Sequence, residues 1–252
     1  NQSRCHLAPV GVDGEGLIHQ DIPPETDVIF ATPSHQCPTT ATMPLARRRA
    51  LLNKAREINA VIVEDDYEFE MSFAGAPSPA LKSLDGDGRV VYVGSFSKSL
   101  FPGLRLGYLV GSRPFIREAR ALRASVLRHV PGHIQRTAAY FLRLGHYDAL
   151  IRRMSGVLSE RRRVMSEAMD LHGLELAGQS GTGGSAFWMR APEGVNTTEL
   201  AAQLQTRSVL IEPGAQGIVM RTEAIELRLQ IVQMRQIAHA DGPAAYFVFI
   251  SR

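Results

Sequence analysis

Three short apolar runs, the first two separated by a helical pattern, restrict what this chain can fold into. Residues 27–31, 60–64 and 90–94 are rich in β-branched side chains, which is typical of buried strands. Residues 44–58 have the apolar spacing of an amphipathic helix, with Leu45 among the inward side chains and arginines 47–49 facing solvent. Strands alternating with helices predict an α/β fold with a mainly parallel sheet, whose ligands bind at the carboxyl ends of the strands.

The loop after the third run holds Lys98 between two serines, with Ser95 and Arg105 nearby. Hydroxyl groups and a forked guanidinium suit a phosphate, and a lysine amine can form a Schiff base with an aldehyde. Pyridoxal phosphate carries both groups. A phosphate-binding P-loop would need glycine before the lysine, where Ser97 stands here. The plain alternative is a solvated turn whose Lys98 faces water.

The second run ends in acids, Asp65 and Asp66, followed by Tyr67. Pyridoxal phosphate acts as an electron sink only if its ring nitrogen keeps a proton, and an aspartate partner does this. A nearby tyrosine can hydrogen-bond the ring oxygen. The alternatives are an acidic loop that binds nothing and a pair of carboxylates for Mg²⁺.

With Lys98 placed 33 residues after Asp65, these two motifs resemble the aspartate-aminotransferase superfamily of pyridoxal phosphate proteins, fold type I. The resemblance implies that Lys98 forms the Schiff base, Asp65 pairs with the pyridine nitrogen and Tyr67 meets the ring hydroxyl oxygen. Similarity to the Glu-Asp-Asp-Tyr form of the motif favours Asp65 over Asp66. The phosphate-binding residues that it implies are Ser95, Ser97 and Arg105.

Residues 33–43, with the arginines 47–49 and the leucine pair 51–52 after them, resemble the Pro-Ser-His-Gln-x-Pro-Thr-Gly run of MocR-type (GntR/MocR) transcriptional regulators. Those proteins are similar to aminotransferases and carry an N-terminal winged helix that binds DNA. Cys37 stands where aminotransferases usually have an asparagine that contacts the cofactor ring, and Thr40 replaces the usual glycine. We interpret His35 as a capped or core-packed residue without a catalytic role.

The remaining sequence is expected to form helices over 114–127, 132–145 and 146–171, strands over 185–189 and 209–212, and a helix over 197–207. Trp188 is expected in the core. Arg228, in Leu-Arg-Leu, resembles the family's arginine that grips a substrate α-carboxylate, although Gln230 replaces the glycine that follows. We therefore expect residues 1–150 to be a partial cofactor-binding large domain, and residues 151–252 a bridging helix and a small α+β domain. The resemblance covers about 7–213, and the tail 244–250 has no counterpart.

Composition narrows the class of protein. The 252 residues are 44% hydrophobic and 21% charged with a net charge of +3, an ordinary globular composition without a nucleic-acid footprint. Two cysteines exclude a disulfide scaffold and favour a cytoplasmic protein, and no apolar run is long enough for a membrane span. The chain opens without methionine, and the resemblance leads us to expect a fragment that lacks the family's phosphate loop and any DNA-binding module.

Three functions compete at this point. The first is an effector-sensing domain that binds pyridoxal phosphate and an amino-group ligand, in a homodimer that contacts DNA only through a module absent from this chain. The second is a true aminotransferase acting on an amino acid. The third is a nucleotide-binding domain that uses Lys98 and the acids. No metal site is expected.

Overall fold

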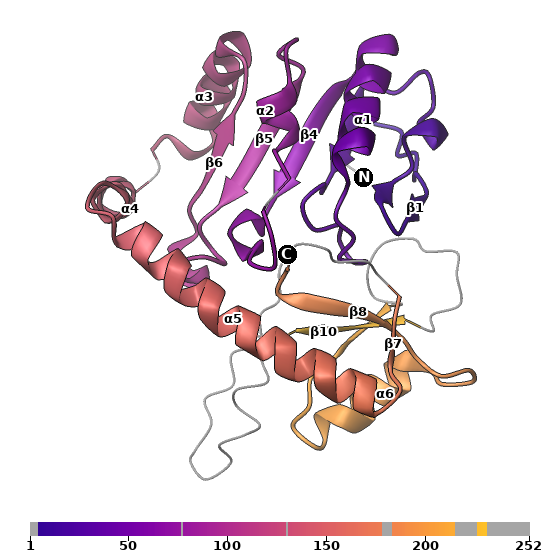
Figure 1. The fold of residues 1–252 in the computed structure, drawn as a ribbon. Helices are drawn as coiled ribbons and strands as arrows, with labels where there is room; N and C mark the ends of the chain where they lie inside the picture. Colours follow the sequence, from indigo (N-terminus) through magenta and orange to yellow (C-terminus); the bar gives the residue numbers. More distant parts are fainter. Residues whose placement is uncertain (1–4, 77, 130, 178–182, 215–225, 231–252) are drawn as a thin grey trace.

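The computed structural model describes residues 5–76, 78–129, 131–177, 183–214 and 226–230 (Figure 1). A hairpin and a short helical turn come first: β1 (Val12–Asp13), β2 (Gly16–Leu17) and η1 (His19–Asp21). A four-stranded sheet follows, with strands in the order β3 (Val28–Ala31), β4 (Val61–Asp66), β5 (Val90–Ser95) and β6 (Gly107–Val110). The first three are parallel, as predicted, and β6 is antiparallel to β5.

The antiparallel β6 departs from the expected alternation of strands and helices. The chain returns from β5 through the lysine loop and η3 (Pro102–Leu104) without a crossover helix, so it pairs in the reverse direction. The sheet therefore has three parallel strands and one antiparallel edge strand, an arrangement common in α/β proteins.

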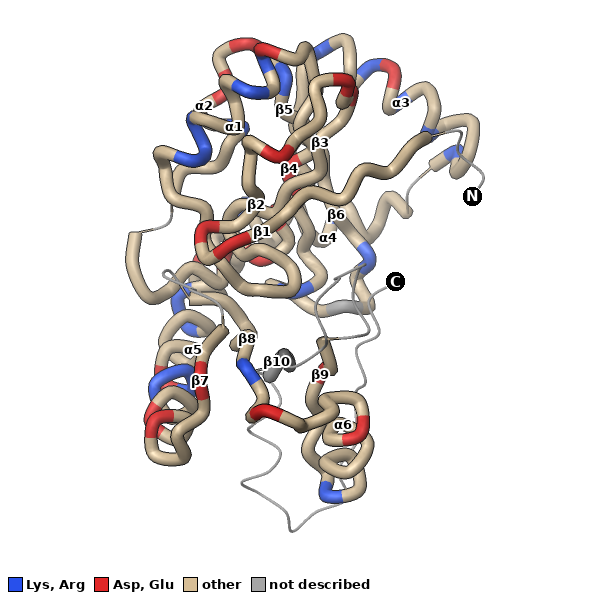
Figure 2. Tube along the Cα trace, turned by 90° about the vertical axis from the view of Figure 1, so that its right-hand side faces the viewer, with Lys and Arg blue, Asp and Glu red and all other residues tan. Residues whose placement is uncertain are grey.

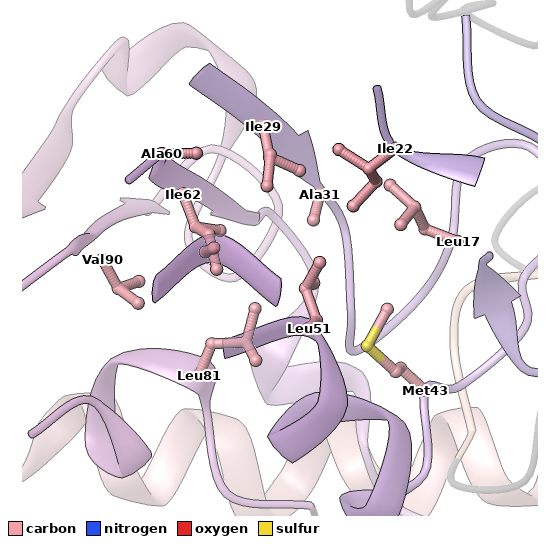
Figure 3. Packing of buried hydrophobic residues seen from close by; sticks show 11 residues of the cluster. Leu17, Ile22, Ile29, Ala31, Met43, Leu51, Ala60, Ile62, Leu81 and Val90 are labelled. Atoms are coloured by element: carbon pink, nitrogen blue, oxygen red, sulfur yellow. The ribbon is translucent and has the colours of Figure 1, made fainter. Parts of the chain in front are cut away.

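Helices α1 (Leu45–Glu57) and α2 (Leu81–Leu84) cover one face of this sheet. Between helices and sheet lies a hydrophobic core in which side chains from β4, β5, α1 and α2 point toward one another (Figure 3). Ile62, Leu51, Leu81 and Val90 have no exposed surface. Burial of this apolar surface is the main stabilising contribution to this half of the molecule.

One prediction about α1 is wrong. Arg48 is fully buried, whereas Leu45 is 37% exposed. The Arg48 guanidinium donates to the carbonyl oxygens of Met43 at 2.9 Å, Pro33 at 2.9 Å and Pro79 at 3.1 Å, and lies 3.9 Å from the buried Glu64 carboxylate. A buried arginine is tolerated because these acceptors satisfy its donors.

Three further helices lead to the C-terminal part of the chain: α3 (Arg113–Leu127), α4 (Gly132–Arg143) and α5 (His146–Leu171). The long α5 runs from beside the lysine loop to a second core, where Met165 and Met169 pack against Phe187 and Met189 (Figure 1). Charges of both signs lie along α5 (Figure 2), and Arg163 pairs with Glu160 at 2.7 Å and Glu167 at 2.6 Å. Such pairs are typical of a solvated helix face.

The second core belongs to an antiparallel sheet with strands in the order β7 (Glu175–Leu176), β8 (Ala186–Arg190), β10 (Glu226–Gln230) and β9 (Glu212–Pro213). Helix α6 (Thr197–Gln205) begins at an Asn196 cap, whose side chain accepts from the Thr198 amide at 3.0 Å. Trp188 is 3% exposed, as predicted for a core residue. The strand expected at 209 begins at Glu212 instead, and the tail 244–250 lies outside the described residues.

None of the helices in the described ranges combines the length and apolarity needed to cross a membrane.

Candidate functional site

Lys98 lies in the loop that joins β5 to β6 and contains η3. The Leu100 amide donates to the Phe96 carbonyl at 2.9 Å, and the Phe96 amide donates to the Leu106 carbonyl at 3.0 Å. These bonds hold Lys98 at the carboxyl end of β5. Its ammonium lies 4.5 Å from the centre of the Tyr67 ring, a favourable cation–π distance, and it also pairs with the Glu68 carboxylate.

Gly94 and Gly103 lie on either side of Lys98. Glycines in such a loop can let backbone amides approach a ligand closely. A Cβ on Gly94 would lie 2.2 Å from the Tyr108 ring, so Gly94 makes room for that ring across the β5–β6 pair. At Gly103 a Cβ would meet only the Phe101 ring, at 3.6 Å. Gly94 therefore serves strand packing.

The two aspartates at the end of β4 lie on opposite faces, because successive side chains of a strand alternate. Asp66 is 3% exposed, on the face that α1 and α2 cover. Burial raises the pKa of Asp66 to about 6, and the nearby Glu64 charge acts in the same direction. Asp65 lies on the more open face; partial burial raises its pKa, and the nearby Lys98 charge opposes that rise. The structure thus places Asp65, and not Asp66, on the side of Lys98.

Tyr67, whose ring lies near Lys98, also contacts His35. The Tyr67 hydroxyl donates to the His35 carbonyl at 3.1 Å. His35 is 2% exposed, and its ring nitrogens have no hydrogen-bond partner within the described part of the chain. Burial lowers the pKa of His35 to about 4, although the Glu68 charge opposes this, so the ring is neutral near pH 7. Its buried position agrees with a core-packed histidine.

The predicted phosphate ligands share one loop. The Ser95 hydroxyl, at the end of β5, accepts from the Ser97 amide at 3.2 Å. Arg105, where the chain turns back toward β6, is exposed and has a left-handed backbone with φ 48°. The structure therefore brings Ser95 and Ser97 together at one strand end, and Arg105 close to them in sequence. Their contacts with a phosphate stay a prediction.

Arg228 is placed elsewhere, on the central strand β10 of the C-terminal sheet, opposite Trp188 of β8 and Glu212 of β9. This agrees with the expected strand. Its side chain lies outside what the structure describes, so the carboxylate-binding role stays a prediction.

Sequence reasoning missed four contacts of this site. Glu68 pairs with Lys98 and also accepts from the Ser185 hydroxyl. The Tyr147 hydroxyl of α5 donates to Glu70 at 2.5 Å and accepts from the buried Ser99 hydroxyl at 2.9 Å. Glu68 follows directly on the acid–tyrosine motif, which was the available signal. The partners on α5 and β8 are remote in sequence and gave none.

The functional groups of these residues suit those of pyridoxal phosphate. Lys98 offers an amine for the aldehyde, and Asp65 offers a carboxylate for the ring nitrogen. Both lie on the same side of the parallel strands β4 and β5. Hydroxyl groups suited to its phosphate follow one of these strands. Within the described part of the chain, no cluster of three or more acidic, histidine or cysteine residues could hold a metal ion.

Comparison with known proteins identifies the family and the fold of this chain. The profile of the family "Aminotransferase class I and II" matches residues 12–240, further toward the C-terminus than the resemblance we recognised in the sequence. Among solved structures, the kynurenine aminotransferase of Pyrococcus horikoshii superposes with a TM-score of 0.79 at 27% identity, covering 88% of this chain and 58% of that one. The fold is therefore that of the fold type I aminotransferases.

Regulators are among the most similar curated proteins. The HTH-type transcriptional regulator TauR of Rhodobacter capsulatus is 58% identical over 210 residues, 83% of this chain and 43% of TauR. The "Probable rhizopine catabolism regulatory protein MocR" of Rhizobium meliloti is 37% identical over 160 residues, 63% of this chain and 32% of that protein. The chain spans less than half the length of these relatives. Resemblance to MocR-type regulators is thus confirmed, and the chain belongs to the aminotransferase class I and II family.

Proposed function

We propose that this chain binds pyridoxal phosphate covalently through Lys98 and forms the effector-sensing part of a MocR-type transcriptional regulator. The observation that carries this proposal is the placement of Lys98 and Asp65 on one side of β4 and β5, with the Tyr67 ring 4.5 Å from the Lys98 ammonium. A lysine, an aspartate and an aromatic hydroxyl are what a pyridine aldehyde requires around it.

Each residue has a distinct task in this proposal. When bound, pyridoxal phosphate supplies an aldehyde that either Lys98 or the amino group of a ligand can engage. Asp65 would keep a proton on the ring nitrogen, and Tyr67 would meet the ring hydroxyl oxygen. Ser95, Ser97 and Arg105 would hold the phosphate. Arg228 would pair with the carboxylate of an amino acid ligand, since arginine binds carboxylates with two parallel hydrogen bonds.

A regulator is favoured over an enzyme by sequence similarity. Identity is 58% with the regulator TauR, but 27% with the kynurenine aminotransferase. DNA binding is assigned to sequence outside these 252 residues, because TauR is an HTH-type protein by name and this chain covers 43% of it. A ligand that binds one conformation better than another would then shift the population that the DNA-binding part reads. We further propose a cytoplasmic homodimer.

The test is a search for a lysine adduct. The chain is incubated with pyridoxal phosphate, scanned for absorbance near the visible edge, reduced with borohydride and mapped by peptide mass spectrometry. We expect the adduct on Lys98, its loss in Lys98→Ala and its persistence in Lys82→Ala, where the lysine pairs with Asp85 at 2.9 Å instead. Equal modification of all lysines would contradict the proposal.

A second measurement distinguishes an effector-sensing domain from an aminotransferase. The chain that carries the adduct is mixed with a panel of amino acids and amines. A spectral change without formation of an oxo acid supports ligand sensing, whereas multiple turnovers to an oxo acid would favour the aminotransferase alternative.

A further inference from the structure

Glu68 occupies an unusual position for a carboxylate. Its side chain is 2% exposed, in the turn between β4 and η2 (Phe69–Met71). A buried carboxylate is unfavourable unless it is paired and hydrogen-bonded. Here it accepts from the Lys98 ammonium and from the Ser185 hydroxyl, and the Ser185 amide lies 3.4 Å from its second oxygen.

The Ser185 contact ties the lysine site to the C-terminal sheet. Ser185 directly precedes β8 and is 117 residues away from Glu68 in sequence. The neighbouring Gly184 amide donates to the Met71 carbonyl at 2.9 Å. A Cβ on Gly183 would lie 2.4 Å from that same carbonyl oxygen, so only glycine permits this close approach. The segment that carries Ser185 is therefore held close to the turn that carries Glu68.

The electrostatics make Glu68 and Lys98 depend on each other. Burial opposes ionisation of Glu68, but the Lys98 charge and hydrogen bond, together with Ser185, outweigh it and lower the pKa of Glu68 to about 2. His35 also faces Glu68, but it is neutral near pH 7 and supplies no competing charge. Lys98 is thus the cation that compensates this buried carboxylate.

We propose that Glu68 is a positioning residue that holds the Lys98 amine and restricts its reaction with aldehydes until the ion pair opens. Ser185 fixes the carboxylate in place for this purpose. The proposal rests on the proposed function for its biological meaning, because Lys98 matters as the cofactor-binding amine. Its physical content, a less reactive Lys98, can be measured without the cofactor.

The sequence provides internal controls for this measurement. Its three lysines are Lys54, Lys82 and Lys98. The Lys98 side chain is 40% exposed, compared with 19% for Lys54 and 22% for Lys82. If exposure alone governed reactivity, Lys98 would react fastest.

The experiment is competitive labelling of the full chain with formaldehyde and cyanoborohydride, followed by peptide mass spectrometry. In the native protein we expect Lys98 to be labelled more slowly than Lys54. In Glu68→Gln, labelling of Lys98 relative to Lys54 rises roughly three- to tenfold, the range for losing one partly exposed charged hydrogen bond. Glu70→Gln is the control, because Glu70 accepts from Tyr147.

Two outcomes would overturn the proposal: Lys98 labelled fastest in the native protein, or an unchanged Lys98 ratio in folded Glu68→Gln. The first needs no variant, so it decides the matter even if Glu68→Gln unfolds. Labelling with pyridoxal phosphate and borohydride is run in parallel. Slow Lys98 methylation with no selective pyridoxal phosphate adduct would sink the proposed function and leave the role of Glu68 intact.

Discussion

Both faces of strand β4 carry acidic side chains, but one face is buried and the other is more exposed. On the face under α1 and α2, Ile62 and Glu64 are fully buried and Asp66 is 3% exposed. On the other face, Val61 is 38% exposed and Asp65 is open toward Lys98. Of the three consecutive acids, Glu64 and Asp66 therefore lie on the covered face, and Asp65, the candidate site residue, lies on the other.

The difference teaches that neighbours, and not residue type, decide what an acid does. Glu64 accepts from the amides of Leu81 and Lys82 at 2.7 and 2.8 Å and faces Arg48, so it joins β4 to α2 and α1. Asp65 has Lys98 as its nearby charge, on the side where a ligand could enter. Glu64 is thus used for stability, and Asp65 remains available for binding.

The largest effect is expected from breaking the buried face. Arg48→Met removes the cation that faces Glu64 and leaves the carbonyls of Met43, Pro33 and Pro79 without their donor. We expect the free energy of unfolding to fall by about 3–5 kcal/mol, as when a buried pair loses one partner. Chemical denaturation measures this, with exposed Arg49→Met as the control. Similar losses in both variants would show that Arg48 contributes no more than a surface arginine.

The second prediction compares the two aspartates by pH. The pKa of Asp66 is about 6 in the folded protein and 3.8 ordinarily, so between these values the folded state holds a proton that the unfolded state has lost. Stability from this group is complete below pH 4 and is lost as the pH rises through 6. Asp66→Asn should therefore gain about 2–3 kcal/mol over the wild type at pH 8 and nothing at pH 4.

Denaturation curves at pH 4, 5.5 and 8 check this, with Asp65→Asn as the matched control on the other face. A gain for Asp66→Asn that is the same at all three pH values would contradict the burial of a titrating carboxyl group.

These two predictions indicate where sequence reasoning works and where it stops. The strands, the helices and the acids at the end of β4 follow from local apolar spacing, which is a property of neighbouring residues. The period of two also separates Asp65 from Asp66. This alternation does not predict which face of the strand the helices cover. The family resemblance was therefore needed to choose Asp65 over Asp66.

What local patterns could not predict depends on distant partners. The arginines 47–49 look like a solvated face, and only the carbonyls of Pro33 and Pro79 in the folded chain explain why Arg48 is buried. The Glu68–Ser185 contact joins residues 117 apart. The antiparallel β6 depends on the path of the lysine loop, which no spacing of apolar residues encodes.

The third prediction sharpens the comparison through the cofactor. Asp65→Asn should weaken binding of pyridoxal phosphate roughly tenfold, because a neutral amide cannot hold a proton on the ring nitrogen as a carboxylate does. Asp66→Asn should leave binding unchanged. Titration of the absorbance change, followed by borohydride trapping, measures both. Equal weakening would mean that the two faces are not functionally distinct.

The smallest effect concerns Thr40, in the loop that leads from β3 to the covered side of the sheet. Thr40 has φ 61°, a left-handed conformation that is strained for a β-branched residue, and within the described residues its buried hydroxyl has no hydrogen-bond partner. Glycine adopts this conformation freely. Thr40→Gly should therefore raise the free energy of unfolding by about 1 kcal/mol, the strain relieved minus the added freedom of the unfolded chain. Ser208→Gly, at φ 60° on an exposed residue without a branched Cβ, is the matched control and should gain less. If Thr40→Gly destabilises the protein in denaturation experiments, the packing of its methyl group outweighs the backbone strain.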